Sequence, residues 1–145
     1  MTKLARVTTV SITAAVAAAL IAPAATMAET AAPTRAPAIK IKDARFGNIL
    51  ATQGRKALYY WNVEKRDFKV HCTGACARAW PPLIVKSRAA VRTTVPGIRG
   101  RFGVIKRPNG KLQVTHNRLP VYTYAHEGPN QVLCDNVDGW FVVRL

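Results

Sequence analysis

Three cysteines and one histidine are the residues of this chain whose types and spacing could do chemistry. Cys72 and Cys76 stand four positions apart in the stretch CTGACARAWPPL, His71 precedes them, and Cys134 lies far downstream. Three thiolates and one imidazole can hold zinc in a tetrahedral site. Zinc motifs usually show two clear ligand pairs, however, and adjacent residues on a strand point to opposite faces. The spacing therefore argues against a metal site and leaves disulfide or thiol chemistry.

The N-terminus indicates the compartment in which these thiols mature. Two basic residues precede an apolar run over residues 7–22, and small residues follow it. This order is typical of a signal peptide over residues 1–28, cleaved after Ala28 or after Ala24. It predicts a periplasmic or secreted protein with no transmembrane span after cleavage. Thiols that lie close together pair under such oxidising conditions.

Cys72–Cys76 is the predicted disulfide. On a helical turn, residues four apart have Cα atoms about 6 Å from each other, which is within the reach of a disulfide. Cys134 would then be a free thiol, an intermolecular link that makes a dimer, or a competitor that pairs with Cys72 or Cys76. The alternative function is a metal-binding or thiol-redox protein that uses Cys72, Cys76 and Cys134.

The chain is strongly basic, and its charge is unevenly distributed. It holds 22 Lys and Arg against 7 Asp and Glu, and no carboxylate stands between Asp67 and Glu127. A field of one sign attracts anions, so we expect anionic envelope polymers or lipid headgroups as partners. The candidate anion-binding residues are Arg99, Arg101, Lys106 and Arg107.

Neither nucleic-acid binding nor catalysis has support in the sequence. The basic segment 86–111 contains a single aromatic residue, Phe102, and so lacks the stacking side chains that single strands favour. His71, His116 and His126 could act as bases, but no Ser or Cys motif supplies a partnered nucleophile. We therefore expect a non-catalytic protein that uses no cofactor.

Short strands are the elements that must position these residues. Segments with strand-like alternation or aromatic β-formers occur at 39–43, 57–63, 67–72, 92–95, 102–106, 112–116, 120–125 and 139–145. Arg-Pro-Asn-Gly at 107–110 joins two of them in a hairpin. Only Thr73–Trp80 indicates a helix, because Thr73 can cap it and the double proline must end it. The sequence predicts a small, mainly β, antiparallel domain with one short helical turn.

An internal repeat organises this domain. Residues 52–64 and 115–127 align at a constant offset of 63, and both read Tyr-x-aromatic-x-x-Glu. A tryptophan and an apolar run follow each copy. The motif residues are Tyr59, Trp61, Glu64 and Trp80 in the first copy, and Tyr122, Tyr124, Glu127 and Trp140 in the second. Residues two apart share one face of a strand, so we expect the aromatic side chains in the core and the glutamates in turns or ion pairs.

The repeat also sets the expected boundaries. A flexible lead-in over residues 29–44 precedes the domain at 45–145. Within the domain, repeat one covers about 45–85, a basic connection covers 86–101, and repeat two covers about 102–145. We therefore expect two β units that are related by a pseudo-twofold axis.

The combined motifs resemble the secreted repeat of bacterial lipoproteins, which is described by a Tyr-x-(Phe/Trp/Tyr)-x-x-Asp motif. The matching residues are Leu58-Tyr59-Tyr60-Trp61, CTGAC at 72–76 and WPPL at 80–83, then Asn109-Gly110, Gln113, Asn117, PVYTY at 120–124 and DGWFVV at 138–143. The chain departs from the family in three ways. Glu64 and Glu127 replace the aspartate, Cys134 stands in place of glycine, and the lipobox cysteine is missing.

This resemblance implies a fold type and an envelope location for a soluble relative, and it implies no activity. We therefore expect an exported, non-catalytic binding or structural module of the envelope that recognises anionic surfaces.

Overall fold

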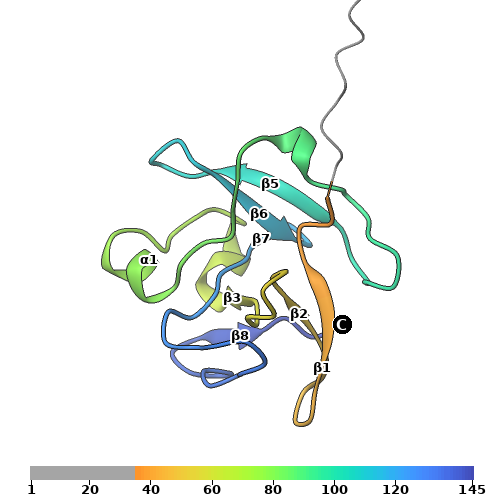
Figure 1. Ribbon diagram of the computed structural model, residues 1–145. Coiled ribbons are helices and arrows are strands. Elements are labelled where there is room, and N and C mark those ends of the chain that lie inside the picture. Colours follow the sequence, from red (N-terminus) through yellow and green to blue (C-terminus); the bar gives the residue numbers. More distant parts are fainter. Residues whose placement is uncertain (1–34) are drawn as a thin grey trace, which may run out of the picture. The chain divides into compact units, whose positions relative to one another are not determined.

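The computed structural model describes residues 35–145, and the predicted signal peptide lies outside them. The described chain is built from short antiparallel strands, one short α-helix and two 3-10 helices (Figure 1). This confirms the predicted fold class. No helix within residues 35–145 is long and apolar enough to cross a membrane.

Strands β1 (Ile39–Asp43) and β2 (Gly47–Ala51) form the first hairpin. Its turn is closed by Asp43, whose Oδ1 accepts hydrogen bonds from the backbone N–H groups of Arg45 and Phe46 at 2.8 and 3.0 Å. The ordered domain thus begins before residue 45, inside the lead-in that we expected to be flexible. The reason is packing, because Ile41 of β1 is buried in the core.

Strands β5 (Phe102–Lys106) and β6 (Leu112–His116) form the second hairpin, as the sequence predicts. The turn between them is closed by the N–H of Arg107, which donates to the carbonyl of Lys111 at 2.9 Å. Strands β4 (Ile84–Val85) and β7 (Leu119–Pro120) also pair with β6. The result is one sheet with β6 at its centre and β4 and β5 on either side.

The segment 67–72 is not the strand that its alternating pattern predicts. It follows the 3-10 helix η1 (Asn62–Arg66), and Phe68 has a φ of +57°. The N–H groups of His71 and Cys72 donate to a side chain, Oε1 of Glu64, at 2.8 and 3.2 Å. Side-chain capture of the backbone N–H groups replaces strand pairing here.

Segment 92–95 also forms no strand. It follows the 3-10 helix η2 (Arg88–Ala90).

The predicted helix is present as α1 (Ala75–Ala79), which ends before the double proline as expected. Its N-cap is Gly74 rather than Thr73, and no side chain caps it. Gly74 has a φ of +55°, a conformation that glycine adopts more readily than threonine.

Backbone hydrogen bonds join the two repeats in a reciprocal way. Tyr59 and Tyr122 exchange a pair of bonds, with N–H to O distances of 2.8 and 2.9 Å. Strand β3 (Tyr59–Trp61) of repeat one pairs with β8 (Trp140–Val142), the last strand of repeat two. The contact equivalent to β3–β8 in the other repeat is an isolated antiparallel β-bridge, which joins Pro82 near the end of repeat one to Tyr122 of repeat two.

Neighbouring bonds repeat the same exchange. The N–H of Leu50 donates to the carbonyl of Val143, just as the N–H of Val114 donates to the carbonyl of Leu83. Each repeat thus supplies its final segment to the other, and the chain end lies beside the first hairpin (Figure 1). An approximate twofold axis between Tyr59 and Tyr122 relates these contacts.

Candidate functional site

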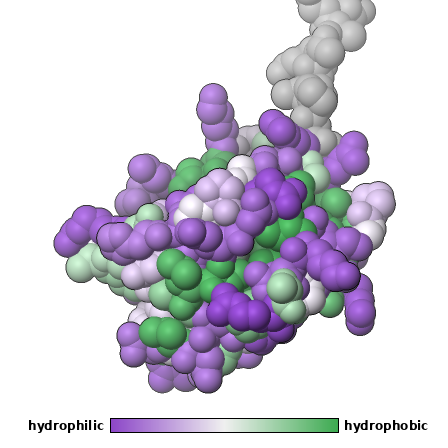
Figure 2. Space-filling view, turned by 60° about the horizontal axis from the view of Figure 1, so that its bottom comes forward, coloured by the Kyte–Doolittle hydropathy of each residue, from purple (hydrophilic) through white to green (hydrophobic). Residues whose placement is uncertain are grey.

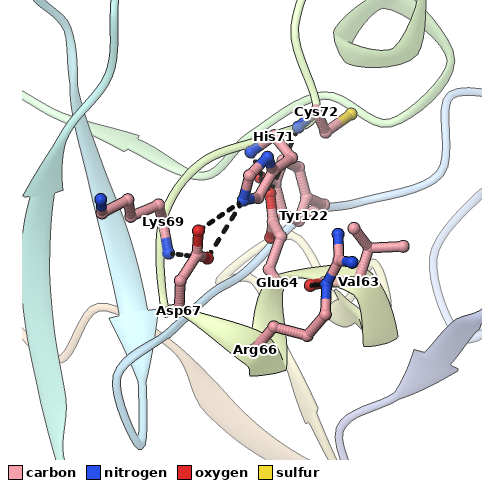
Figure 3. Close-up of polar contacts among 8 residues, drawn as sticks. All are labelled: Val63, Glu64, Arg66, Asp67, Lys69, His71, Cys72 and Tyr122. Atoms are coloured by element: carbon pink, nitrogen blue, oxygen red, sulfur yellow. Dashed lines mark hydrogen bonds and ion pairs between the residues drawn. The ribbon is translucent and has the colours of Figure 1, made fainter.

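Two crossed tyrosine–glutamate pairs occupy the centre of the domain. The hydroxyl of Tyr122 donates to Oε1 of Glu64 at 2.7 Å, as Figure 3 shows, and the hydroxyl of Tyr59 donates to Oε1 of Glu127. Each bond joins the tyrosine of one repeat to the acid of the other. The two tyrosines are fully buried, and the glutamates are 0% and 3% exposed.

Each glutamate also accepts hydrogen bonds from the backbone of the segment that follows it in its own repeat. Oε1 of Glu64 accepts from the backbone of His71 and Cys72, and Oε1 of Glu127 accepts from the N–H of Leu133 at 2.6 Å. Neither acid is in an ion pair among residues 35–145. The role in turn structure that we expected is therefore present, whereas the expected ion pairs are not.

Electrostatics at the crossed pairs favours phenols that keep their protons. Burial is the main cause that raises the pKa of Tyr59 and of Tyr122, and the neighbouring carboxylates raise both pKa values further. Burial also raises the pKa of the Glu64 carboxyl, although its hydrogen-bond donors act in the opposite direction. In both glutamates Oε1 receives all the hydrogen bonds, and the buried Oε2 has no partner within the described chain.

An aromatic stack crosses the core beside these pairs. Its rings are, in order, Trp61, Trp140, Trp80 and Tyr124, with centroid distances of 5.4, 4.0 and 4.8 Å. The two inner tryptophans are buried, and Trp61 and Tyr124 at the ends are half-buried.

Each buried tyrosine meets one inner tryptophan edge-on. Tyr59 contacts Trp80 at 5.2 Å, and Tyr122 contacts Trp140 at 5.1 Å. The predicted core role of the motif aromatics therefore holds for Tyr59, Tyr122 and both inner tryptophans.

The predicted disulfide between Cys72 and Cys76 is confirmed, with a Cα–Cα distance of 5.2 Å. Two of the four ligands of the metal alternative are thereby bonded to each other. No group of three His, Cys, Asp or Glu in residues 35–145 is arranged to hold a metal ion.

Cys134 is a free, half-buried thiol. It lies beside the side chain of Tyr124. Burial, followed by the negative charge of Glu127, raises the pKa of the Cys134 thiol. The intermolecular link through this cysteine stays a prediction.

The three histidines lie apart and have structural partners. Nε2 of His71 lies 3.0 Å from the carboxylate of Asp67 at the surface. The carboxylate of Asp67 also accepts a hydrogen bond from the backbone N–H of Lys69 (Figure 3). This bond, followed by the contact with His71, lowers the pKa of Asp67. His116 contacts the carbonyl of Arg99, and burial lowers its pKa. His126 is exposed, with its ring against Tyr124.

The four candidate anion-binding residues do not form one patch. Arg99, Arg101 and Lys106 are exposed, and Arg101 and Lys106 line different grooves. Arg107 is only 4% exposed, because its guanidinium donates inward to Oε1 of Gln113 and to the carbonyl of Cys72. The guanidinium of Arg107 therefore supports the interior.

The structure assembles a different cationic site, which we call the basic groove. It lies along β4, the end of β5 and the start of β6. Its lining residues are Ile84, Val85, Lys86, Arg88, Lys106, Gly110, Lys111 and Leu112. Four of these eight residues are cationic and none is acidic. Sequence reasoning selected only Lys106, because pairing of β4 with β6 brings together positions more than 20 residues apart.

Comparisons with protein-family models, curated proteins and solved structures give no match for this chain. The resemblance to the secreted lipoprotein repeat therefore stays a prediction.

Proposed function

We propose that this protein is an exported, non-catalytic module of the cell envelope that binds an anionic polysaccharide in the basic groove. The observation that carries the proposal is the groove itself, in which four cations surround one concave surface without a carboxylate. Lys86 and Arg88 follow β4, Lys106 ends β5, and Lys111 precedes β6.

A polymeric anion suits this arrangement better than a single small one. The four cationic side chains are exposed, so each contact with an anion is screened by water and salt and is weak by itself. Several such contacts made by one chain of charges add up, and the field of a basic protein raises the local concentration of that chain. Aliphatic side chains, including Ile84 at 40% exposure, supply an apolar floor for sugar C–H groups.

Among polyanions, the lining favours polysaccharide over single-stranded nucleic acid. No aromatic side chain lines the basic groove, so bases would find no ring on which to stack. The signal-peptide pattern and the resemblance to a secreted repeat support an envelope partner. Figure 2 shows one face of the domain, where hydrophilic side chains project around hydrophobic surface.

Heparin provides a probe for the basic groove. We replace Lys86, Arg88, Lys106 and Lys111 together by Gln, and compare this groove variant with a control in which Lys40, Lys42, Lys65 and Arg78 become Gln. The control residues are exposed on β1, η1 and α1, so both variants lose the same charge. At roughly 0.5 kcal/mol for each exposed contact, the groove variant should lose about 2 kcal/mol, or about thirtyfold in Kd.

The measurement is the heparin Kd at fixed ionic strength, with a single-stranded oligonucleotide as competitor. Stronger loss in the groove variant than in the control supports the proposal. Equal loss in both variants would mean that net charge alone causes binding, and the proposal would fail. Tighter binding of the oligonucleotide than of heparin would reassign the partner to nucleic acid.

A further inference from the structure

The aromatic stack and the crossed tyrosine–glutamate pairs form one connected unit of oxidisable rings. Indole and phenol are the most readily oxidised aromatic side chains of proteins. Six such rings are in contact here, at centroid distances between 4.0 and 5.4 Å. The unit reaches toward solvent at half-buried Trp61 and is buried at its centre.

Packing alone does not require carboxylates at this centre. Phenylalanine would fill the ring positions of Tyr59 and Tyr122, and burying an ionised carboxylate carries a large desolvation penalty. Instead, the hydroxyl of each buried phenol donates a hydrogen bond to a buried glutamate of the other repeat. Phenol, proton acceptor and neighbouring indole therefore occur twice, in the same geometry.

We infer that this unit takes up a single oxidising equivalent from the surface and stores it on a buried tyrosine. An outer-sphere one-electron oxidant that meets Trp61 gains one electron and leaves an indole radical cation. Electron transfer along the stack moves this electron deficit to Trp140 and Trp80. Tyr122 then reduces Trp140, and Tyr59 reduces Trp80 in the equivalent step.

The proton moves together with that electron. As Tyr122 gives one electron to the indole, its O–H bond breaks and a new O–H bond forms at Oε1 of Glu64. The products are a neutral tyrosyl radical, an intact tryptophan and a protonated glutamate. Proton transfer needs donor and acceptor within hydrogen-bond distance, and the 2.7 Å contact provides this.

The surroundings of Tyr59 and Tyr122 favour the formation and survival of a tyrosyl radical. The raised pKa values of Tyr59 and Tyr122 keep the phenols protonated at rest, so a proton is present to leave with the electron. Both rings are fully buried, which separates a tyrosyl radical from solutes that would react with it. An exported domain would gain protection of its backbone and its disulfide against one-electron damage.

Laser-flash oxidation of the full chain with a photogenerated ruthenium(III) polypyridyl complex tests the inference. A Cys134→Ser background removes the thiol beside Tyr124 as a competing reductant. The readouts are the transient absorption of tryptophan and tyrosyl radicals and the electron paramagnetic resonance of the trapped radical. We expect Tyr59→Phe/Tyr122→Phe to lower the tyrosyl yield more than tenfold and to lengthen the lifetime of the tryptophan radical.

Tyr60→Phe is the matched control, because Tyr60 is half-buried and its hydroxyl meets Lys65 rather than a carboxylate. It should leave the yield within about twofold. An unchanged yield in the double variant, or loss of the radical in Tyr60→Phe, would place the radical on Tyr60 or Tyr124 rather than on a fully buried tyrosine and overturn the inference.

The proton step has its own test, which also serves if the double variant does not fold. In a Tyr59→Phe background, only Tyr122 has a carboxylate partner. Adding Glu64→Gln keeps the ring and a carbonyl acceptor but removes the group that can take the proton. The tyrosyl radical should then form at least tenfold more slowly, and an equal rate with and without Glu64→Gln would refute the proton step.

Discussion

Replacing Tyr122 by Phe tests whether the crossed pairs hold the two repeats together. The change keeps the ring, and with it the edge-on contact to Trp140, and removes only the hydroxyl that donates to Glu64. The carboxylate keeps its two backbone donors, from His71 and Cys72, so it is weakened and not orphaned. The perturbation therefore isolates one hydrogen bond between the repeats.

The expected loss follows from the charge and burial of the acceptor. A hydrogen bond to a charged group contributes about 1.5–3 kcal/mol, and this one is fully buried. We expect Tyr122→Phe to lower the free energy of unfolding by about 2 kcal/mol. Glu64→Ala leaves three donors without an acceptor, at about 1–3 kcal/mol each, and should cost about 4 kcal/mol or more.

Denaturant unfolding measures both losses at neutral pH, with tryptophan fluorescence as the signal. Tyr60→Phe again serves as the control and should stay within about 0.5 kcal/mol of wild type, as most substitutions outside the core do. A loss below 0.5 kcal/mol for Tyr122→Phe, or equal losses for Tyr122→Phe and Glu64→Ala, would show that the reasoning about this carboxylate is wrong.

Two further predictions concern pH and the disulfide. Because burial raises the folded-state pKa of Glu64 above its unfolded value, its contribution to stability is full below the unfolded pKa and is lost as pH rises through the folded pKa. The difference in unfolding free energy between wild type and Glu64→Gln should therefore fall with rising pH, and a rising difference would contradict this sign. For the disulfide, a loop of five residues should stabilise by about 2 kcal/mol. Cys72→Ser/Cys76→Ser should thus lower stability by that amount and abolish the effect of a reductant, whereas reductant sensitivity in that variant would point to a bond through Cys134.

The predictable parts of the fold are those that local chemistry decides. Asn109-Gly110 gave the β5–β6 hairpin its turn, and Pro81-Pro82 ended α1. The alternation of segment 67–72 is typical of a strand, and the strand predicted from it was wrong. The buried carboxylate of Glu64 accepts hydrogen bonds from N–H groups of this segment that a strand would use for pairing.

The candidate sites show the same limit. The offset of 63 predicts that Tyr59 and Tyr122 are equivalent, and that Glu64 and Glu127 are equivalent. It does not predict which tyrosine meets which acid, because the two stand five positions apart within each repeat and a bond inside one repeat is also conceivable. The crossed arrangement accompanies the exchange of final segments between the repeats. That exchange is a property of the tertiary structure, which the repeat pattern alone does not predict.

The two repeats share their core but differ at their hairpin turns, and only one of these turns contributes to the proposed site in the basic groove. Only three residues join β1 to β2, and Asp43 closes that turn with its carboxylate. Five residues join β5 to β6, and these include the buried Arg107 and the groove residue Lys111. The β1–β2 turn contains one cation, Arg45, and is flanked by the carboxylate of Asp43, whereas the β5–β6 turn contains Arg107 and Lys111 and no carboxylate. The basic groove therefore lies at the end of the domain that holds the β5–β6 turn. The crossed pairs, in contrast, need both repeats, because neither tyrosine reaches a glutamate of its own copy. Changes in the basic groove should therefore alter binding without altering the core, whereas a change in either crossed pair weakens the contact between the repeats.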